Sequence, residues 1–210
     1  MLTRWTRRIT AGSSILVLLA ATGIEAQLDR LDVNPRAGAA FPVGTLADYA
    51  NVGANFGLTV AYPVTDPLGV FVNGEVDMLN GNSAFGLPDM NLWRYQAGVQ
   101  GELLGRGRDS WSLFGHVGAG GTTFRSKEFF LDTSPEMLTF EGTYFTGSAG
   151  LMLVFGSSET VQGYLGSRVH WSPIDETETQ VLRDRTRGQL DSLTAALSVP
   201  VTLGLRVRVA

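Results

Sequence analysis

The stretch NLWRYQAGVQGELL, from Asn91 to Leu104, alternates between two kinds of side chain. One parity is apolar, begins with aromatic residues, and comprises Trp93, Tyr95, Ala97, Val99, Gly101 and Leu103. The other parity is polar and comprises Arg94, Gln96, Gln100 and Glu102. Alternation with a period of two predicts a β-strand with two chemically different faces. A half-buried strand of a water-soluble sandwich has this pattern, and so does a membrane-spanning strand around a polar interior.

The same alternation recurs along the chain and predicts eight strands. Their approximate ranges are 33–41, 52–62, 68–78, 91–104, 111–124, 143–155, 161–171 and 193–209. Most of these segments reach the roughly 9–11 residues that a tilted strand needs to cross a bilayer, whereas soluble strands average about 5–6. The short connections PVTDP, LGRGRDS and GSSET alternate with long ones at 43–51, 79–91, 125–142 and 172–191. The pattern predicts an all-β fold: an eight-stranded antiparallel up-and-down transmembrane β-barrel with turns at one end and loops at the other.

The charges on the polar parity indicate a lumen and not a soluble surface. The chain contains a single lysine, Lys127, which falls in a long connection. The polar parity of the predicted strands instead carries both acidic and basic residues among glycine, serine and threonine. An eight-stranded barrel is just wide enough for side chains to fill it, and charges there must pair to offset their desolvation. We therefore predict a salt-bridge network in the lumen, formed by Glu75, Asp77, Arg94, Glu102, Arg168 and Arg206.

Aromatic residues on the apolar parity lie near the ends of the predicted strands. In membrane barrels such residues form girdles at the two lipid–water interfaces. The predicted girdle consists of Phe41, Tyr62, Trp93, Trp111, Phe155 and Trp171. A soluble, lipocalin-like binding barrel is the alternative; its apolar parity would face inward.

The first 26 residues have the features of a signal peptide. Arg4, Arg7 and Arg8 precede an apolar segment from Ile9 to Ile24, and Ala26 suits a cleavage site before Gln27. We predict a signal peptide at 1–26 and a barrel domain at 27–210; an uncleaved membrane anchor is the alternative. Cleavage would make the chain more acidic than its full-length net charge of −4, which disfavours nucleic acid as a partner. The chain has no cysteine, so disulfides contribute nothing to this assignment.

The predicted mature chain resembles the eight-stranded outer-membrane β-barrel family that includes OmpX and the transmembrane domain of OmpA. The resemblance rests on the signal peptide, the segments AGAAF and NFGLTVAY, the eight alternating strands and the alternating connection lengths. It implies a monomer in the bacterial outer membrane, surrounded by lipid and lipopolysaccharide and inserted by the barrel-assembly machinery. Many family members end in an aromatic residue, whereas this sequence ends LRVRVA, which predicts a weaker assembly signal.

The sequence predicts no catalytic, cofactor-binding or metal site. His116 and His170 are the only histidines, and they share the polar parity with Ser112 and Ser148, but their spacing matches neither a nucleophile–base pair nor a metal site. The expected function is to anchor exposed loops, in envelope integrity or surface adhesion. The connection SPIDETETQVLRDRTRGQLD is a possible contact surface for lipopolysaccharide, another cell or a host ligand. A narrow pore and a lipid-modifying barrel enzyme are the alternative functions.

Overall fold

The computed structural model describes residues 30–105, 111–127, 129–131, 134–138, 141–158, 160–174 and 193–209. The predicted signal peptide at 1–26 and most of the charged connection at 172–191 lie outside the described residues. Within the described residues, no helix is both long enough and apolar enough to cross a membrane.

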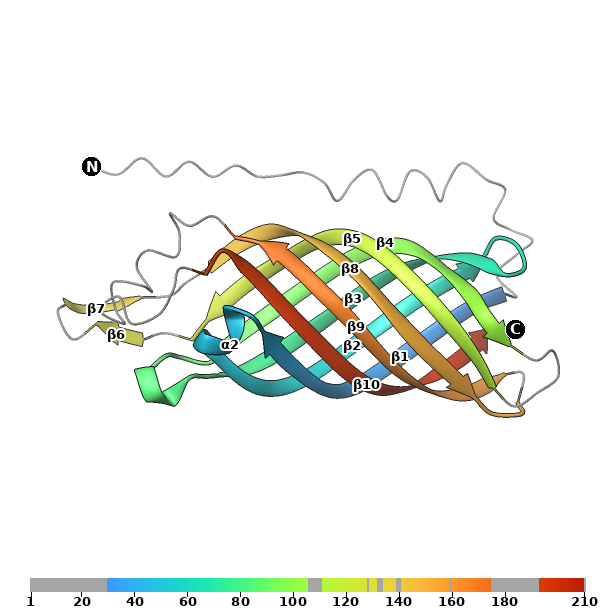
Figure 1. Cartoon of the computed structure of the whole chain (residues 1–210), viewed down its shortest axis with the longest axis horizontal. Coiled ribbons are helices and arrows are strands. Elements are labelled where there is room, and N and C mark those ends of the chain that lie inside the picture. The colour runs from blue at the N-terminus through green and yellow to red at the C-terminus, as the bar shows by residue number, and fades with distance from the viewer. Residues whose placement is uncertain are drawn as a thin grey trace.

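The described chain forms a closed antiparallel barrel of eight strands (Figure 1). The strands are β1 (Leu31–Val43), β2 (Ala50–Pro63), β3 (Leu68–Gly81), β4 (Met90–Gly105), β5 (Trp111–Ser126), β8 (Glu141–Phe155), β9 (Val161–Pro173) and β10 (Ala195–Val209). Each strand pairs with its neighbour along the chain, and β1 pairs with β10 to close the barrel. The predicted fold class is therefore confirmed, with boundaries that differ by a few residues; the last strand begins at Ala195 and not at Leu193.

The connections differ in length between the two ends of the barrel. The end that we call the turn end carries the connections β2–β3, β4–β5 and β8–β9, together with the start of β1 and the end of β10. The opposite, loop end carries α2 (Leu46–Tyr49), the 3-10 helix η3 (Ser83–Phe85) and the hairpin of β6 (Phe129–Leu131) and β7 (Ser134–Leu138), as Figure 1 shows. The predicted alternation of short and long connections corresponds to these two ends.

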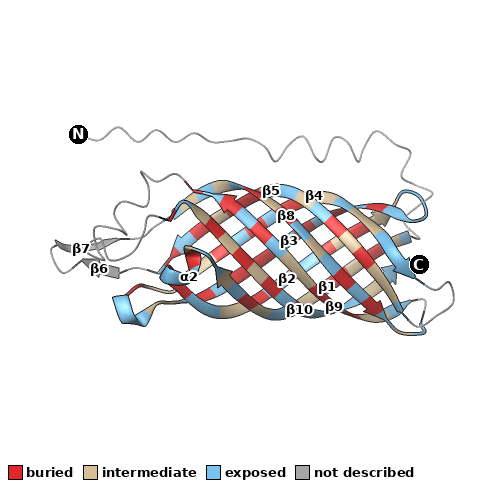
Figure 2. Ribbon diagram, in the orientation of Figure 1, coloured by how far each residue is buried: buried red, intermediate tan, exposed pale blue. Residues whose placement is uncertain are grey.

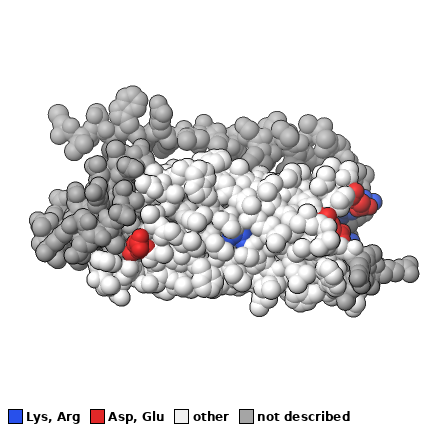
Figure 3. All heavy atoms as spheres, viewed as in Figure 1, with Lys and Arg blue, Asp and Glu red and all other residues white. Residues whose placement is uncertain are grey.

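The two parities of each strand face opposite sides of the barrel wall, so buried and exposed residues alternate in Figure 2. In β4, Trp93 and Tyr95 are 52% and 54% exposed, whereas Arg94 and Gln96, which alternate with them, are buried. A water-soluble barrel would have the reverse arrangement, because large contiguous apolar surfaces are disfavoured in water. Figure 3 shows the same inversion: the middle of the visible wall is almost free of charge, and charged side chains gather at the turn end.

An apolar cluster closes the loop end of the lumen. The short helix α2 folds inward, so that Leu46 and Tyr49 are almost completely buried. Hydrogen bonds hold this segment to its surroundings: Asn82 N–H donates to Tyr49 O at 3.1 Å, and Thr45 Oγ1 donates to Ala195 O at 3.2 Å. We call the cluster the apolar plug; it comprises Ala40, Leu46, Tyr49, Ala50, Leu79, Leu87, Leu92, Phe124, Ile174, Leu193 and Ala196.

Candidate functional site in the barrel lumen

Glu75 lies at the centre of a buried charged cluster below the apolar plug. It comes from β3, forms ion pairs with two arginines and lies beside a histidine, all three from other strands. Arg36 of β1 pairs directly with Glu75, His170 Nε2 of β9 lies 2.7 Å from Glu75 Oε1, and Arg94 Nη1 of β4 lies 3.7 Å from the same oxygen. Because Glu75 is buried, these three neighbours supply the compensation that water would otherwise provide.

Asp77 and Arg94 form a second pair beside Glu75. Arg94 Nη1 donates to Asp77 Oδ2 at 2.5 Å, and Arg94 Nη2 donates to Ser198 Oγ at 2.7 Å. Ser198 in turn donates to Asp77 Oδ2 at 3.0 Å, and Asn55 Nδ2 donates to Asp77 Oδ1 at 2.6 Å. We call Arg36, Glu75, Asp77, Arg94 and His170, with Asn55 and Ser198, the central network. It links strands from opposite sides of the barrel and so fixes their positions across the lumen.

A glycine on β2 makes the contact between Arg36 and Glu75 possible. Strands β1 and β3 are not neighbours, since β2 lies between them, and Gly57 pairs with both Arg36 and Glu75. A Cβ at Gly57 would lie 2.8 Å from Arg36 Cζ. The missing side chain therefore leaves the space in which the guanidinium reaches across β2. The same guanidinium donates to Thr59 Oγ1 and to Asn73 Oδ1, both at 2.6 Å.

Arg168 and His116 form a separate pair in the middle of the lumen. Arg168 Nε donates to His116 Nε2 at 2.7 Å. A neutral imidazole has one acceptor nitrogen, so this bond assigns the ring proton of His116 to Nδ1. The ring of Phe71 packs edge-on against His116 at 6.0 Å between centroids, and Arg168 Cζ lies 5.5 Å from the centroid of Phe71. The Arg168 guanidinium thus contacts the Phe71 ring and donates a hydrogen bond to His116.

The turn end of the lumen contains a third layer of contacts. Arg206 donates to Asp32 Oδ2 through Nε at 3.0 Å and through Nη2 at 2.5 Å, and Arg208 Nε approaches Asp32 Oδ1 at 3.4 Å. Arg206 Cζ also lies 4.9 Å from the centroid of the Phe114 ring. Phe114 belongs to a small buried cluster with Met152, Val154 and Tyr164. These contacts connect the first strand to the last where the barrel closes.

The structure brings some of the sequence-predicted lumen residues together and separates others. Glu75, Asp77 and Arg94 are in direct contact in the central network, whereas Arg168 pairs with His116 and Arg206 pairs with Asp32. Glu102 does not reach any of them. It is exposed at the turn end of β4, beyond which the β4–β5 register shifts, and its Oε1 accepts a hydrogen bond from Ser112 Oγ at 3.1 Å. The predicted network therefore needs correction at Glu102.

Several lumen residues were missing from the predicted network, among them Arg36, His170 and Asp32. Arg36 and His170 both lie on the polar parity of their strands, and Asp32 immediately precedes the predicted start of the first strand. Parity alone places Arg36 and His170 in the lumen. It could not have identified their partner, because Glu75 is contacted across an intervening strand or across the barrel.

The predicted girdle residues lie near both ends of the barrel wall. Five of the six side chains are exposed, and Tyr62 is half-buried. At the turn end, Trp111 and Phe155 are direct cross-strand partners. The loop-end residues are Phe41, Trp93 and Trp171, and the turn-end residues are Tyr62, Trp111 and Phe155.

The described residues do not form a hydrolytic or metal-binding arrangement around the histidines. Ser148 and His170 are cross-strand partners, but Ser148 Oγ donates to Gln96 Oε1 at 3.1 Å and the imidazole faces Glu75. His116 accepts from Arg168. Within the part of the chain that the structure describes, no group of three or more His, Cys, Asp or Glu side chains is placed to hold a metal ion.

Among the described residues, Lys127 and Asp89 form an exposed ion pair at the loop end, outside the barrel strands. Lys127 Nζ donates to Asp89 Oδ2 at 2.7 Å, and Gly81 N–H donates to Asp89 Oδ1 at 3.0 Å. The hydrogen bond from Lys127, and secondly the one from Gly81, hold the pKa of Asp89 below its ordinary value of 3.8. A carboxyl with a depressed pKa stabilises the fold above its unfolded-state pKa, and this stabilisation is lost as the pH falls through the lower, folded-state pKa.

We expect the substitution Lys127→Met to raise the pKa of Asp89 towards 3.8, but not fully to it, because the Gly81 hydrogen bond remains. The measurement is an NMR titration of the Asp89 carboxyl carbon below about pH 5, where this group changes charge. The stability change should be small, about 0.2–1 kcal/mol, because both side chains are exposed. An unchanged pKa of Asp89 in the variant would show that Lys127 does not form this pair in solution.

The comparisons with known proteins support the fold. No protein-family model matches the chain, and no curated protein matches its sequence. Among solved structures, the chain is similar to Neisserial surface protein A (NspA), with a TM-score of 0.56 and 14% identity over 85% of this chain and 96% of that one. The attachment invasion locus protein Ail of Yersinia pestis matches at a TM-score of 0.48 and 15% identity, over 85% and 98% of the two chains. The outer membrane protein OprG of Pseudomonas aeruginosa matches at a TM-score of 0.47 and 13% identity, over 85% of this chain and 96% of that one.

The likeness to NspA extends over almost the whole of that chain and shows a shared eight-stranded barrel fold. The predicted resemblance to eight-stranded outer-membrane barrels is thereby confirmed for the fold. The apolar outer wall, the polar lumen and the two ends with short and long connections are all features of barrels of this class.

Proposed function

We propose that this protein is a non-enzymatic barrel of the bacterial outer membrane. It acts as a closed, rigid anchor that presents its loop end outside the cell, in envelope integrity or surface adhesion. The observation that carries the proposal is that side chains fill the lumen in three successive layers. These layers are the apolar plug, the buried charged groups in the middle, and the Asp32–Arg206 contacts with the Phe114 cluster at the turn end.

The height of the barrel wall supports a position in the membrane. Trp93 pairs with Thr123, which lies twelve residues beyond Trp111 along β5. With a rise of about 3.3 Å per residue and a strand tilt of about 40°, twelve residues span roughly 30 Å along the barrel axis. This matches the thickness of a hydrocarbon core, about 30 Å. The exposed aromatic residues would then lie at its two interfaces.

The three layers disfavour the alternative of a narrow pore. A conducting lumen needs a continuous path of water, and an apolar constriction tends to exclude water. Here Leu46, Tyr49 and Phe124 of the apolar plug are at most 2% exposed. Beneath them, the oppositely charged groups of the central network pair with one another and so are not free to solvate a passing ion.

Export and assembly form part of the same proposal. Residues 1–26 would serve as a cleaved signal peptide, since Arg4, Arg7 and Arg8 precede an apolar segment and Ala26 provides a small residue at the cleavage site. The barrel-assembly machinery would insert residues 27–210 as a monomer into outer-membrane lipid and lipopolysaccharide. A closed barrel supports a monomer because it has no unpaired strand edge.

Fractionation and bilayer recordings test this proposal. We expect the expressed protein to be found in the outer-membrane fraction, to begin at Gln27, and to migrate faster on a gel before heating than after it. The purified barrel in planar bilayers should give no conductance above background. Recovery as a soluble periplasmic protein would contradict the membrane assignment, and stable single-channel steps would contradict the closed lumen.

Loop replacement distinguishes adhesion from envelope integrity. Replacing residues 175–190 with a Gly-Ser linker removes much of the charged connection, and replacing turn residues 64–67 is the matched control at the opposite end. If the protein acts in adhesion, the first variant loses attachment to cells and the second keeps it. If the barrel wall alone supports envelope integrity, both variants restore the detergent resistance of a deletion strain. A null strain that is unaffected in both assays would contradict the proposed function.

A further inference from the structure

Arg168 is a half-buried cation in the lumen without a carboxylate partner among the described residues. Its Nε donates to His116, which this bond assigns as neutral, and Arg168 forms none of the ion pairs within 4.0 Å that the described residues make. Its Nη1 atom is buried and has no hydrogen-bond partner. An uncompensated buried charge is costly, so a guanidinium in this position calls for a partner that the side chains do not supply.

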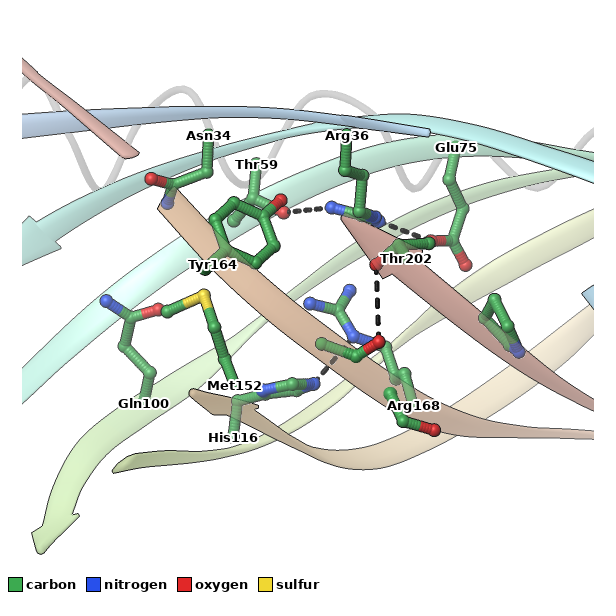
Figure 4. Close-up of a pocket in the computed structure, with 13 residues that line it drawn as sticks. Asn34, Arg36, Thr59, Glu75, Gln100, His116, Met152, Tyr164, Arg168 and Thr202 are labelled. Atoms are coloured by element: carbon green, nitrogen blue, oxygen red, sulfur yellow. Dashed lines mark hydrogen bonds and ion pairs between the residues drawn. The ribbon is translucent and has the colours of Figure 1, made fainter. Parts of the chain in front are cut away.

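A pocket of about 30 Å³ lies beside this guanidinium. Figure 4 shows Arg36 and Arg168 on opposite sides of it, with Tyr164 and Thr202 between them. The charged residues that line it are Arg36, Arg168 and Glu75, so its wall carries one net positive charge. Glu75 is already engaged by Arg36, Arg94 and His170 on its own side, which leaves the charge of Arg168 as the uncompensated one.

The size and the donors of the pocket limit the class of ligand. A cavity needs about 10–15 Å³ of such volume to hold one water, so the pocket has room for two or three waters or for one small inorganic anion. Hydroxyl and amide groups of Tyr164, Asn34 and Gln100 face the same space and can donate. Met152 and Pro200 complete the wall with apolar surface, which strengthens electrostatic attraction by excluding water.

We propose that this pocket is a halide-binding site, in which a chloride ion accepts hydrogen bonds from Arg168 and compensates its buried charge. The ion would act as a structural partner for the middle layer of the lumen. The site is independent of the proposed cellular function, because it concerns the state of the folded lumen and not the exposed loops.

Bromide provides a direct probe of the site. Crystals of the detergent-solubilised barrel grown in sodium bromide should show an anomalous difference peak within about 3.5 Å of Arg168 Nη1, since this is hydrogen-bond distance for a large anion. The peak should be absent in Arg168→Gln. A pocket that contains only water, with no anomalous signal beside Arg168 in the parent protein, would overturn the proposal.

A thermal unfolding series checks the site in solution. Exchanging the bulky anion gluconate for bromide at constant ionic strength should raise the unfolding temperature of the parent barrel saturably, by about 2–4 °C, because a ligand that binds only the folded state stabilises it. Arg168→Lys keeps the charge and should retain a bromide response, whereas Arg168→Gln should lose it. Arg125→Gln, at an exposed position at the loop end of β5, is the control and should respond like the parent. An equal response in Arg168→Gln and the parent would contradict the site.

Discussion

Glu75→Gln is expected to destabilise the folded barrel by about 3–5 kcal/mol, because it removes one partner of a buried charge cluster. The substitution preserves the shape of the side chain but removes the negative charge between Arg36, Arg94 and His170. Asp77, which pairs with Arg94, would then be the remaining carboxylate of the central network. The measurement is equilibrium unfolding by urea in lipid vesicles, followed by the fluorescence of Trp93, Trp111 and Trp171 in the barrel.

A second-site substitution separates charge imbalance from lost packing. Arg36→Met in the Glu75→Gln background removes the guanidinium that Glu75 neutralises, so the double variant should be more stable than Glu75→Gln alone, by about 1–3 kcal/mol. Glu102→Gln is the matched control; this carboxylate is exposed at the turn end, and the change should stay within about 0.5 kcal/mol. If Glu75→Gln is as well tolerated as Glu102→Gln, the central network does not stabilise the barrel.

The sequence was sufficient to predict the eight strands and the direction in which their side chains face. Period-two alternation survives in almost every strand because one face must meet lipid and the other must fill a polar lumen. Arg94 and Trp93 are adjacent in sequence, yet Arg94 is buried and Trp93 is half exposed, as the alternation predicts. The alternating connection lengths also predicted which strand ends lie together.

The partners of the lumen charges could not be predicted in the same way, because they depend on register and on contacts between distant strands. Glu75 and Arg94 are direct partners in the β3–β4 ladder, but Arg36 reaches Glu75 across β2 through the space left by Gly57. Asp32 and Arg206 meet only because β1 and β10 close the barrel. Parity specifies that a side chain faces the lumen, but not which layer of the lumen it occupies.

The apolar plug was also absent from the sequence prediction. Its helix, α2, has four residues, which is too short for a helical period to be visible. The connections at 43–51 and 79–91 were expected only as long loops. Leu46 and Tyr49 nevertheless fold inward, because the lumen at the loop end is itself apolar around Leu92 and Phe124. These side chains provide a surface against which Leu46 and Tyr49 are buried. Apolar residues in the long connections of a barrel with a polar lumen can therefore indicate that the loop end of the lumen is closed.

Val117→Arg is expected to destabilise the barrel in a bilayer by about 2–4 kcal/mol, which is the cost of an arginine on the lipid face at the membrane midplane. Val117 is 53% exposed and lies midway along β5 between Trp111 and Thr123, the partner of Trp93. Its cross-strand partners Val99 and Ala149 lie on the same outer face. On a water-soluble barrel, an arginine at such an exposed position would change stability by no more than about 0.5 kcal/mol.

The control is Val161→Arg, which makes the same chemical change at the first residue of β9, at the turn end of the wall. Its cost should be only about 0–1 kcal/mol, because an arginine there can reach the interface. Both variants are compared with the parent by urea unfolding in vesicles, and the difference between the two positions is the decisive quantity. Since both valines are similarly exposed, a soluble barrel would tolerate the two substitutions equally, and only a surrounding hydrocarbon layer makes the cost depend on depth. Equal, small effects at Val117 and Val161 would therefore contradict the membrane-spanning arrangement itself.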